Sequence, residues 1–112
     1  YSVIDRADEA IVDPAREHAI AFVPFFPLGS AFTGGPAKLA EDPAIGRVAA
    51  KHDVLPTQVA LAWLLAHYDR MLLIPGTTSV AHVEENIAAG DVTLDDEDMA
   101  TLEDAEQVGG PI

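Results

Sequence analysis

The stretch from Leu72 to Asn86, LLIPGTTSVAHVEEN, decides the fold. Its first three residues are apolar and β-prone, and Pro75-Gly76 after them stops a strand and turns the chain. Ser79 is placed to cap the helix that follows, and the N–H groups left over at a helix N-terminus favour an anionic ligand. From the residues alone, an ordinary turn between a strand and a helix explains the stretch equally well. Phosphate binding is therefore one of two interpretations at this point.

The composition predicts a single domain, residues 1–112, with a packed core, because 49% of the residues are hydrophobic and 22% are charged. No apolar run has membrane-spanning length and no signal-peptide pattern occurs, so we expect a cytoplasmic protein without a membrane partner. A net charge of −13 with six Lys and Arg argues against nucleic-acid binding. The chain starts at Tyr1, inside a β-prone segment, which indicates a fragment or a processed product.

Hydrophobic periodicity predicts strands at 1–4, 19–26 and 71–74, and helices at 9–18, 44–51, 56–68, 80–89 and after Asp95. In the first helix, Asp13 is the expected cap and Pro14 the first helical residue. The helix at 56–68 is apolar over most of its circumference and should pack on two sides, with Trp63 in the core. Residues 31–42 are expected to form a mobile surface loop, and residues 107–112 a loose tail.

The order of these elements predicts the fold class. The segment 19–26 is almost wholly apolar without alternation, which is typical of a parallel strand buried on both faces. Two units, 19–30 and 71–79, repeat the order strand, Pro, Gly, hydroxyl residue, and repeated β-turn-α units form a parallel sheet with crossover helices. A complete (β/α)8 TIM barrel takes about 250 residues. The sequence therefore predicts an α/β fold that is part of such a barrel.

Several kinds of catalytic or metal site find no support in the residues. The four histidines, His18, His52, His67 and His82, lie near helix ends or on polar faces without the spacing of a helical zinc pair, so we expect no metal site. The acidic run 95–98 is interpreted as a helix cap and first turn, not as a cation site. No nucleophile elbow, phosphate-binding loop or dinucleotide fingerprint occurs.

Four segments together resemble the aldo-keto reductase family, in its order and with its spacing. YSVIDR at 1–6 is similar to the end of that family's strand six, and FFPLGS at 25–30 followed by FTG at 32–34 resembles the segment after strand seven. TQVALAWLL at 57–65 resembles the helix before strand eight, and the stretch from 74 to 86 resembles the cofactor segment. The resemblance covers nearly the whole chain and identifies it as the C-terminal part of such a barrel, strands six to eight.

The resemblance implies an NAD(P)H-dependent oxidoreductase that reduces aldehydes or ketones to alcohols. By analogy, its cofactor-binding residues would be Phe25, Pro27, Leu28, Gly29, Ser30, Ile74, Gly76, Thr77, Thr78, His82, Glu85 and Asn86. Phe25 would stack on the nicotinamide, and residues 28–30 would bind the pyrophosphate. Thr77 and Thr78 would hold the adenosine 2′-phosphate, and residues 85–86 would bind adenine.

Two positions depart from the family's pattern: Gly76 stands where many members carry Lys, and His82 where many carry Arg. The two Thr hydroxyls favour NADP(H), and NAD(H) is the alternative. The family's catalytic Asp, Tyr, Lys and His lie on earlier strands, so we expect no catalytic residue here and no activity of this chain alone. A part-barrel would expose sheet edges and self-associate. The alternative function is a non-enzymatic α/β module, or a stable proteolytic product that only self-associates.

Overall fold

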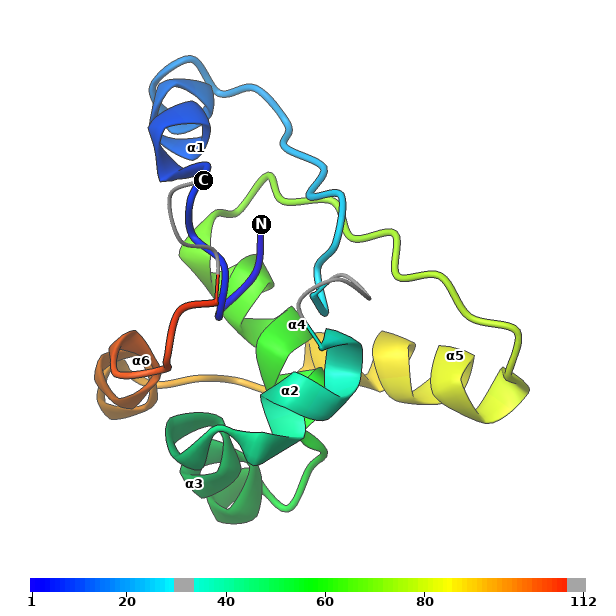
Figure 1. The fold of residues 1–112 in the computed structure, drawn as a ribbon. Coiled ribbons are helices and arrows are strands. Elements are labelled where there is room, and N and C mark those ends of the chain that lie inside the picture. Colours follow the sequence, from blue (N-terminus) through cyan, green and yellow to red (C-terminus); the bar gives the residue numbers. More distant parts are fainter. Residues whose placement is uncertain (30–33, 109–112) are drawn as a thin grey trace.

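The computed structural model describes residues 1–29 and 34–108. Its helices are α1 (Glu9–Glu17), α2 (Gly35–Glu41), α3 (Pro43–His52), α4 (Pro56–His67), α5 (Val80–Ala88) and α6 (Asp96–Glu103), with a short 3-10 helix η2 (Ala89–Asp91) after α5 (Figure 1). The predicted helices at 44–51, 56–68 and 80–89 are confirmed within one or two residues at each end. In the described part of the chain, no helix is both long and apolar enough to cross a lipid bilayer.

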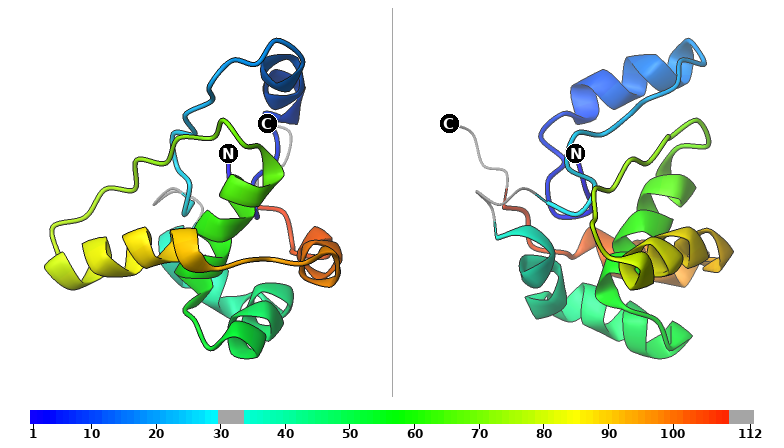
Figure 2. Two further views of the ribbon diagram at one scale, coloured as in Figure 1. Left: turned by 180° about the vertical axis from the view of Figure 1, so that it is seen from behind. Right: turned by 90° about the vertical axis from the view of Figure 1, so that its right-hand side faces the viewer.

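Helix α4 runs through the middle of the molecule, with α5 on one side of it and α6 on the other (Figures 1 and 2). Every residue of α4 from Gln58 to Leu64 is buried, which confirms the prediction of a helix packed on more than one side. The helix begins at Pro56, and the Gln58 side-chain oxygen accepts a hydrogen bond from the Leu55 N–H at 2.9 Å. Packing on all sides, rather than an amphipathic stripe, therefore holds α4 in place.

Trp63 lies at the centre of the core and is fully buried. The Tyr1 ring stacks on it at 5.9 Å between centroids, and the His67 ring stacks at 4.5 Å. The Arg6 guanidinium lies 4.7 Å from the Trp63 ring and also donates to the Leu102 carbonyl at 2.8 Å. The prediction that Trp63 is a core residue is confirmed, and Arg6 joins the N-terminal segment to both α4 and α6.

The predicted strands do not form as continuous strands in the described residues. Residues 1–5 instead make a tight turn, in which the Ser2 and Asp5 backbones bond to each other at 2.8 and 3.1 Å. The segments 19–26 and 71–74 meet only at one parallel bridge, between Phe22 and Met71. There the Phe22 carbonyl accepts from the N–H of the residue after Met71 at 2.9 Å. The two segments therefore pair in the predicted parallel direction, but at one bridge and not along a whole strand.

The expectation that segment 19–26 is buried on both faces is wrong for this chain. Phe22 packs against the core, whereas Ile20, Val23 and Phe25 are exposed, Phe25 by 86%. A parallel strand is covered on both faces only when elements lie on each side of it. In the described structure the core covers this segment on one side, so its apolar side chains are left facing solvent.

The predicted loop at 31–42 is wrong from residue 35 onward, because α2 occupies Gly35–Glu41. Gly34 enters this helix with φ +98°, a left-handed conformation that suits glycine, and Leu39 of α2 is fully buried. A single buried leucine is a weak periodic pattern, so the sequence did not indicate this helix. Residues 31–33 lie outside the described part of the chain. Asp42 then caps α3 by accepting from the Ala44 and Ile45 N–H groups.

The predicted helix at 9–18 is confirmed as α1 (Glu9–Glu17), but its expected cap is wrong, and so is the expectation that the whole tail is loose. Helix α1 starts after Asp8, so Asp13 is not its cap and Pro14 lies inside it. Pro14 is exposed, where water can satisfy the carbonyl that its missing N–H leaves unbonded. In the predicted loose tail, Gln107 donates to the Val3 carbonyl at 3.0 Å and the Val108 N–H donates to the Ile4 carbonyl at 2.8 Å. The tail is therefore anchored at 107–108, and residues 109–112 lie outside the described part.

Helix α6 is joined to α3 through one buried carboxylate. Asp98 is 2% exposed and accepts from Lys51 Nζ at 2.8 Å, His52 Nε2 at 2.7 Å and the Asp95 N–H at 3.0 Å. Asp95 in turn accepts from the Asp98 N–H at 2.8 Å, which confirms the cap interpretation of the acidic run. Burial opposes ionisation of Asp98, but the hydrogen bonds from Lys51 and His52 outweigh it and hold its pKa well below the usual range.

We expect Asp98→Asn to lower the free energy of unfolding by about 2 kcal/mol at pH 7, since it removes the charge from a buried, hydrogen-bonded site. Because the folded-state pKa lies below the unfolded value of about 3.9, this stabilisation is present above that pH and is lost as the pH falls. The difference in the free energy of unfolding between Asp98→Asn and wild type should therefore become smaller in acid. Urea unfolding at several pH values would measure it.

Asp96→Asn is the matched control, because Asp96 is exposed in the same helical turn. If Asp98→Asn proved as stable as Asp96→Asn at pH 7, the stabilising role of the buried carboxylate would be contradicted.

Candidate functional site

The single parallel bridge sets the register of the two segments that carry the predicted site. Phe22 and Met71 are the bridged pair, and Phe25 and Ile74 each lie three residues further along. Parallel chains advance in the same direction by about 3.3 Å per residue. The bridge therefore brings residues 25–29 and 74–76 to the same end of the two segments, as a functional site at the carboxyl ends of parallel strands requires.

These two segments line one hollow with a volume of about 340 Å³. Its lining residues are Phe25, Phe26, Pro27, Leu28, Gly29, Pro36, Ile74, Pro75 and Gly76. The structure thus brings together all the predicted site residues between 25 and 29 and between 74 and 76. The volume of the hollow lies in the range of small-molecule sites, and none of the described residues that line the hollow is charged.

Phe25 presents an uncovered aromatic ring to this hollow. The ring is tilted by 51° against that of Phe26, with 5.8 Å between centroids. An exposed aromatic face of this kind can stack on a planar, apolar ligand ring. Phe26, Pro36 and Pro75 were not among the predicted residues. The positions of Phe26 and Pro75 inside the two quoted segments could have indicated them, whereas Pro36 belongs to α2, which the sequence did not predict.

The turn after Phe26 depends on a glycine. The Gly29 N–H donates to the Phe26 carbonyl at 3.1 Å, and Gly29 has φ +85°. A β-carbon there would lie 3.6 Å from the Gly35 carbonyl oxygen, which is ordinary contact. The backbone conformation, and not crowding, therefore requires glycine at this position. Ser30, also a predicted site residue, lies outside the described part of the chain.

Beyond the hollow, the chain forms an ordered turn that starts α5. Thr77 Oγ1 accepts from the Ser79 N–H at 3.1 Å, and Ser79 Oγ accepts from the His82 N–H at 3.3 Å. The predicted cap at Ser79 is confirmed. Thr77, Thr78 and His82 are exposed, and they do not line the hollow. Thr77 and Thr78 directly precede the N-terminus of α5, and the positive end of a helix favours an anion.

Two predicted site residues lie further along α5. Glu85 and Asn86 are half-buried, and Asn86 lines a second, mostly apolar hollow of about 380 Å³ between α4, residues 71–75 and α5. The structure thus divides the predicted residues into two groups, one in the hollow at 25–29 and 74–76, and one along the turn and helix from 77 to 86. In Figure 1, α5 projects away from the centre of the molecule.

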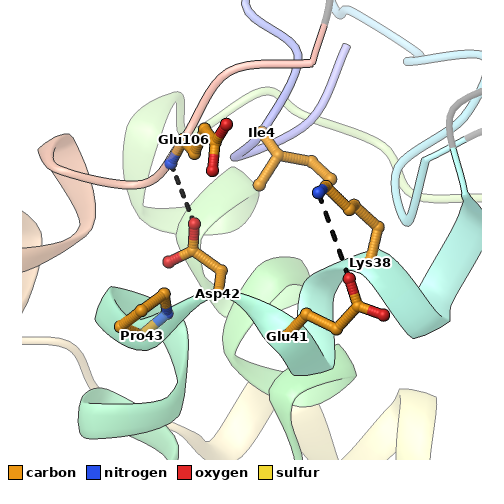
Figure 3. A pocket seen from close by; sticks show the side chains of 6 residues that line it. All are labelled: Ile4, Lys38, Glu41, Asp42, Pro43 and Glu106. Atoms are coloured by element: carbon orange, nitrogen blue, oxygen red, sulfur yellow. Dashed lines mark hydrogen bonds and ion pairs between the residues drawn. The ribbon is translucent and has the colours of Figure 1, made fainter.

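A further small cavity lies between Ile4, α2 and the start of α3 (Figure 3). Its volume of about 30 Å³ suits a single water molecule. Asp42 on its wall accepts from the Glu106 N–H at 2.8 Å, and Lys38 pairs with Glu41 at 4.0 Å. The polar groups of this cavity therefore bind one another, and it is too small for an organic ligand.

The titratable cluster of Tyr1, Glu9 and His67 lies outside the hollow. The Tyr1 hydroxyl donates to Glu9, and His67 Nε2 lies 2.9 Å from both side chains. Burial and then the Glu9 carboxylate raise the pKa of Tyr1 above its usual range, so its hydroxyl stays protonated at neutral pH. This is unlike a proton donor matched to pH 7, and the cluster serves packing around Trp63. No arrangement able to hold a metal ion occurs among the described His, Asp and Glu side chains.

Comparison with known proteins shows the family. The model of the aldo/keto reductase family matches residues 1–107. The chain belongs to the aldo/keto reductase family. It is 47% identical over 103 residues to pyridoxine 4-dehydrogenase of Escherichia coli strain K12, an alignment that covers 92% of this chain and 34% of that protein. The chain thus spans about a third of the length of this relative.

Solved structures of the family share its arrangement. An aldo-keto reductase from Klebsiella pneumoniae in complex with NADPH aligns with a TM-score of 0.78 and 27% identity, over 92% of this chain and 36% of that one. An aldo-keto reductase enzyme from a Medee basin deep-sea metagenome library aligns with a TM-score of 0.81 over 98% of this chain and 38% of that one; at 24% identity it shows the fold alone. Such structures are (β/α)8 barrels.

We expect Gly29→Ala to lower the free energy of unfolding by about 1 kcal/mol, because alanine is strained at positive φ. Gly76→Ala is the matched control in the same hollow, since a β-carbon there meets nothing within 4 Å and no positive φ is needed. Chemical denaturation of both variants would measure the difference. Equal stability of the two would show that the Gly29 turn is not constrained as described.

Proposed function

We propose that this chain is the C-terminal, cofactor-binding part of a cytoplasmic NAD(P)H-dependent reductase, comprising strands six to eight of a (β/α)8 barrel. The whole enzyme would reduce aldehydes or ketones to alcohols. One observation carries the proposal: the Phe22–Met71 bridge brings the two family segments to one hollow, with the Phe25 ring uncovered in it. Membership of the family supports the reaction class.

The residues of the hollow fit the nicotinamide half of such a cofactor. Phe25 would stack on the nicotinamide ring and keep water from one face of it, while Ile74 and Leu28 supply apolar contacts. The turn at Gly29 would bring its backbone close to the pyrophosphate. When bound, the cofactor supplies a hydride to the carbonyl carbon of the substrate. None of the described lining residues carries a side chain that could transfer the accompanying proton.

The turn and helix from 77 to 86 fit the adenosine half. Thr77 and Thr78 would bind the 2′-phosphate at the N-terminus of α5, and residues 85–86 would bind adenine. These hydroxyls favour NADP(H), as does the presence of NADPH in the Klebsiella pneumoniae relative. Gly76 adds no charge beside the phosphate, and His82 adds one only when protonated, so the phosphate would be held mainly by neutral donors.

We expect Gly76→Lys, in the full-length enzyme, to tighten NADPH binding about tenfold and leave NADH binding unchanged, because it adds a charge-assisted bond to the 2′-phosphate. The site has room for the side chain, since a β-carbon at Gly76 meets nothing within 4 Å. Fluorescence titration with both cofactors would measure the two dissociation constants.

Gly46→Lys controls for added charge, because Gly46 lies in α3, outside the hollow, and has the same free space. An equal gain for NADH, or the same gain from Gly46→Lys, would contradict a 2′-phosphate site beside residue 76.

A second candidate role, self-association without catalysis, has support of its own. Apolar side chains are exposed along both extended segments, among them Val23, Phe25, Leu72 and Ile74. Beyond the single bridge, no described strand pairing uses the backbone of these segments. Exposed apolar surface next to free strand edges is a template for pairing with another chain.

We expect the purified 112-residue chain to form dimers or larger species by light scattering and to consume no NADPH with a simple aldehyde. Association should strengthen with salt, because screening weakens the repulsion between copies that each carry a charge of −13. A monomer at all salt concentrations would contradict self-association, and aldehyde-dependent turnover would contradict the expected inactivity.

A further inference from the structure

Helix α5 carries the proposed adenosine-binding residues but is weakly held by apolar contacts. No residue of Val80–Ala88 is buried, and Val80 and Ile87 are each about three-quarters exposed. Apolar burial fixes most surface helices to a protein core. The orientation of α5, and with it of Glu85 and Asn86, therefore depends on contacts at its C-terminal end.

At its C-terminal end, α5 is bonded to α4 through the Gln58 side chain. Gln58 is 9% exposed; its Nε2 donates to the Glu85 carbonyl at 3.0 Å, and its Oε1 accepts from the Leu55 N–H at 2.9 Å. The Glu85 carbonyl also accepts from the Ala89 N–H, so it belongs to the last turn of α5. One buried amide thus joins the start of α4 to the end of α5.

Only an amide side chain of this length satisfies both contacts. Gln supplies one acceptor and two donors, whereas Glu supplies no donor at neutral pH and Met supplies no donor and only a weak sulfur acceptor. Helix α4 itself is held by fully buried side chains such as Val59, Trp63 and Leu64. Loss of the Gln58 donor should therefore release α5 without displacing α4.

We propose that Gln58 is a positioning residue for the adenosine half of the cofactor. Through the Glu85 carbonyl it holds α5 at the angle that presents Glu85 and Asn86 to the ligand. This inference rests on the proposed function. Phe25 and Gly29 lie on another segment and have no bond to Gln58, so their part of the nicotinamide site should not depend on it.

The test uses Gln58→Glu and Gln58→Met in the full-length enzyme. Gln58→Glu keeps an acceptor for Leu55 and replaces the donor to Glu85 by a carboxylate oxygen that repels the Glu85 carbonyl, so it breaks the α5 contact and spares the start of α4. We expect both variants to bind NADPH and adenosine 2′,5′-bisphosphate about fivefold more weakly, the factor for one lost hydrogen bond. Binding of reduced nicotinamide mononucleotide, which lacks adenosine, should not change. The KM for NADPH should rise while kcat at saturation stays constant.

Hydrogen exchange without cofactor gives a readout independent of activity. In the Gln58 variants, the amides of α5 should exchange about fivefold faster and those of α3 at the wild-type rate. Asp98→Asn is the control, because it weakens the α3–α6 joint and has no contact with α5. It should leave α5 exchange and NADPH affinity unchanged.

The possible failures are distinguishable. If the wild-type enzyme binds neither NADPH nor NADH, the proposed function is overturned, and α5 exchange still tests the anchoring contact. If the wild type binds NADPH and the Gln58 variants bind it equally well, the positioning role is overturned. The positioning role is also overturned if the Gln58 variants weaken the binding of reduced nicotinamide mononucleotide as much as that of NADPH. Gln58 would then act on the fold as a whole.

Discussion

Burial of α4 on all sides between Gln58 and Leu64 is the constraint on which the rest of the structure depends. A helix with no polar face must be covered by other elements, and here α2, α3, α5 and the N-terminal segment supply that cover. Trp63 holds the segment at 1–6 in position, because the Tyr1 ring stacks on the Trp63 ring and the Arg6 guanidinium lies over it. Arg6 then reaches the end of α6. Contacts that start from one helix thereby order the two ends of the described chain.

The site follows from this arrangement with little regular sheet structure. One bridge, Phe22 to Met71, is enough to set the register of two extended segments, and a tight turn at Gly29 completes the hollow. The same segments leave apolar side chains such as Phe25 exposed. Binding and association thus use the same surface. An uncovered aromatic ring can receive a ligand, and an uncovered strand edge can receive another chain.

The proposed phosphate site, at Thr77 and Thr78, relies on neutral groups in a protein of charge −13. This site would use the hydroxyls of Thr77 and Thr78 and backbone N–H groups of the first turn of α5. Neutral donors at a helix N-terminus bind an anion through dipoles, with less long-range attraction than Lys or Arg supply. Precise placement of α5 therefore matters more here, which gives the buried amide of Gln58 its importance.

The sequence by itself determined the helices with strong patterns or caps, namely α1, α3, α4, α5 and the start of α6, and the two segments that meet in the hollow. The sequence signals that predict these helices each span only a few residues: a cap such as Ser79, or apolar residues three and four apart. Only the tertiary structure decided that α2 forms, that the predicted strands shorten to one bridge, and that Gln58 reaches Glu85. These features depend on partners distant in the chain, whose presence and position no local pattern records.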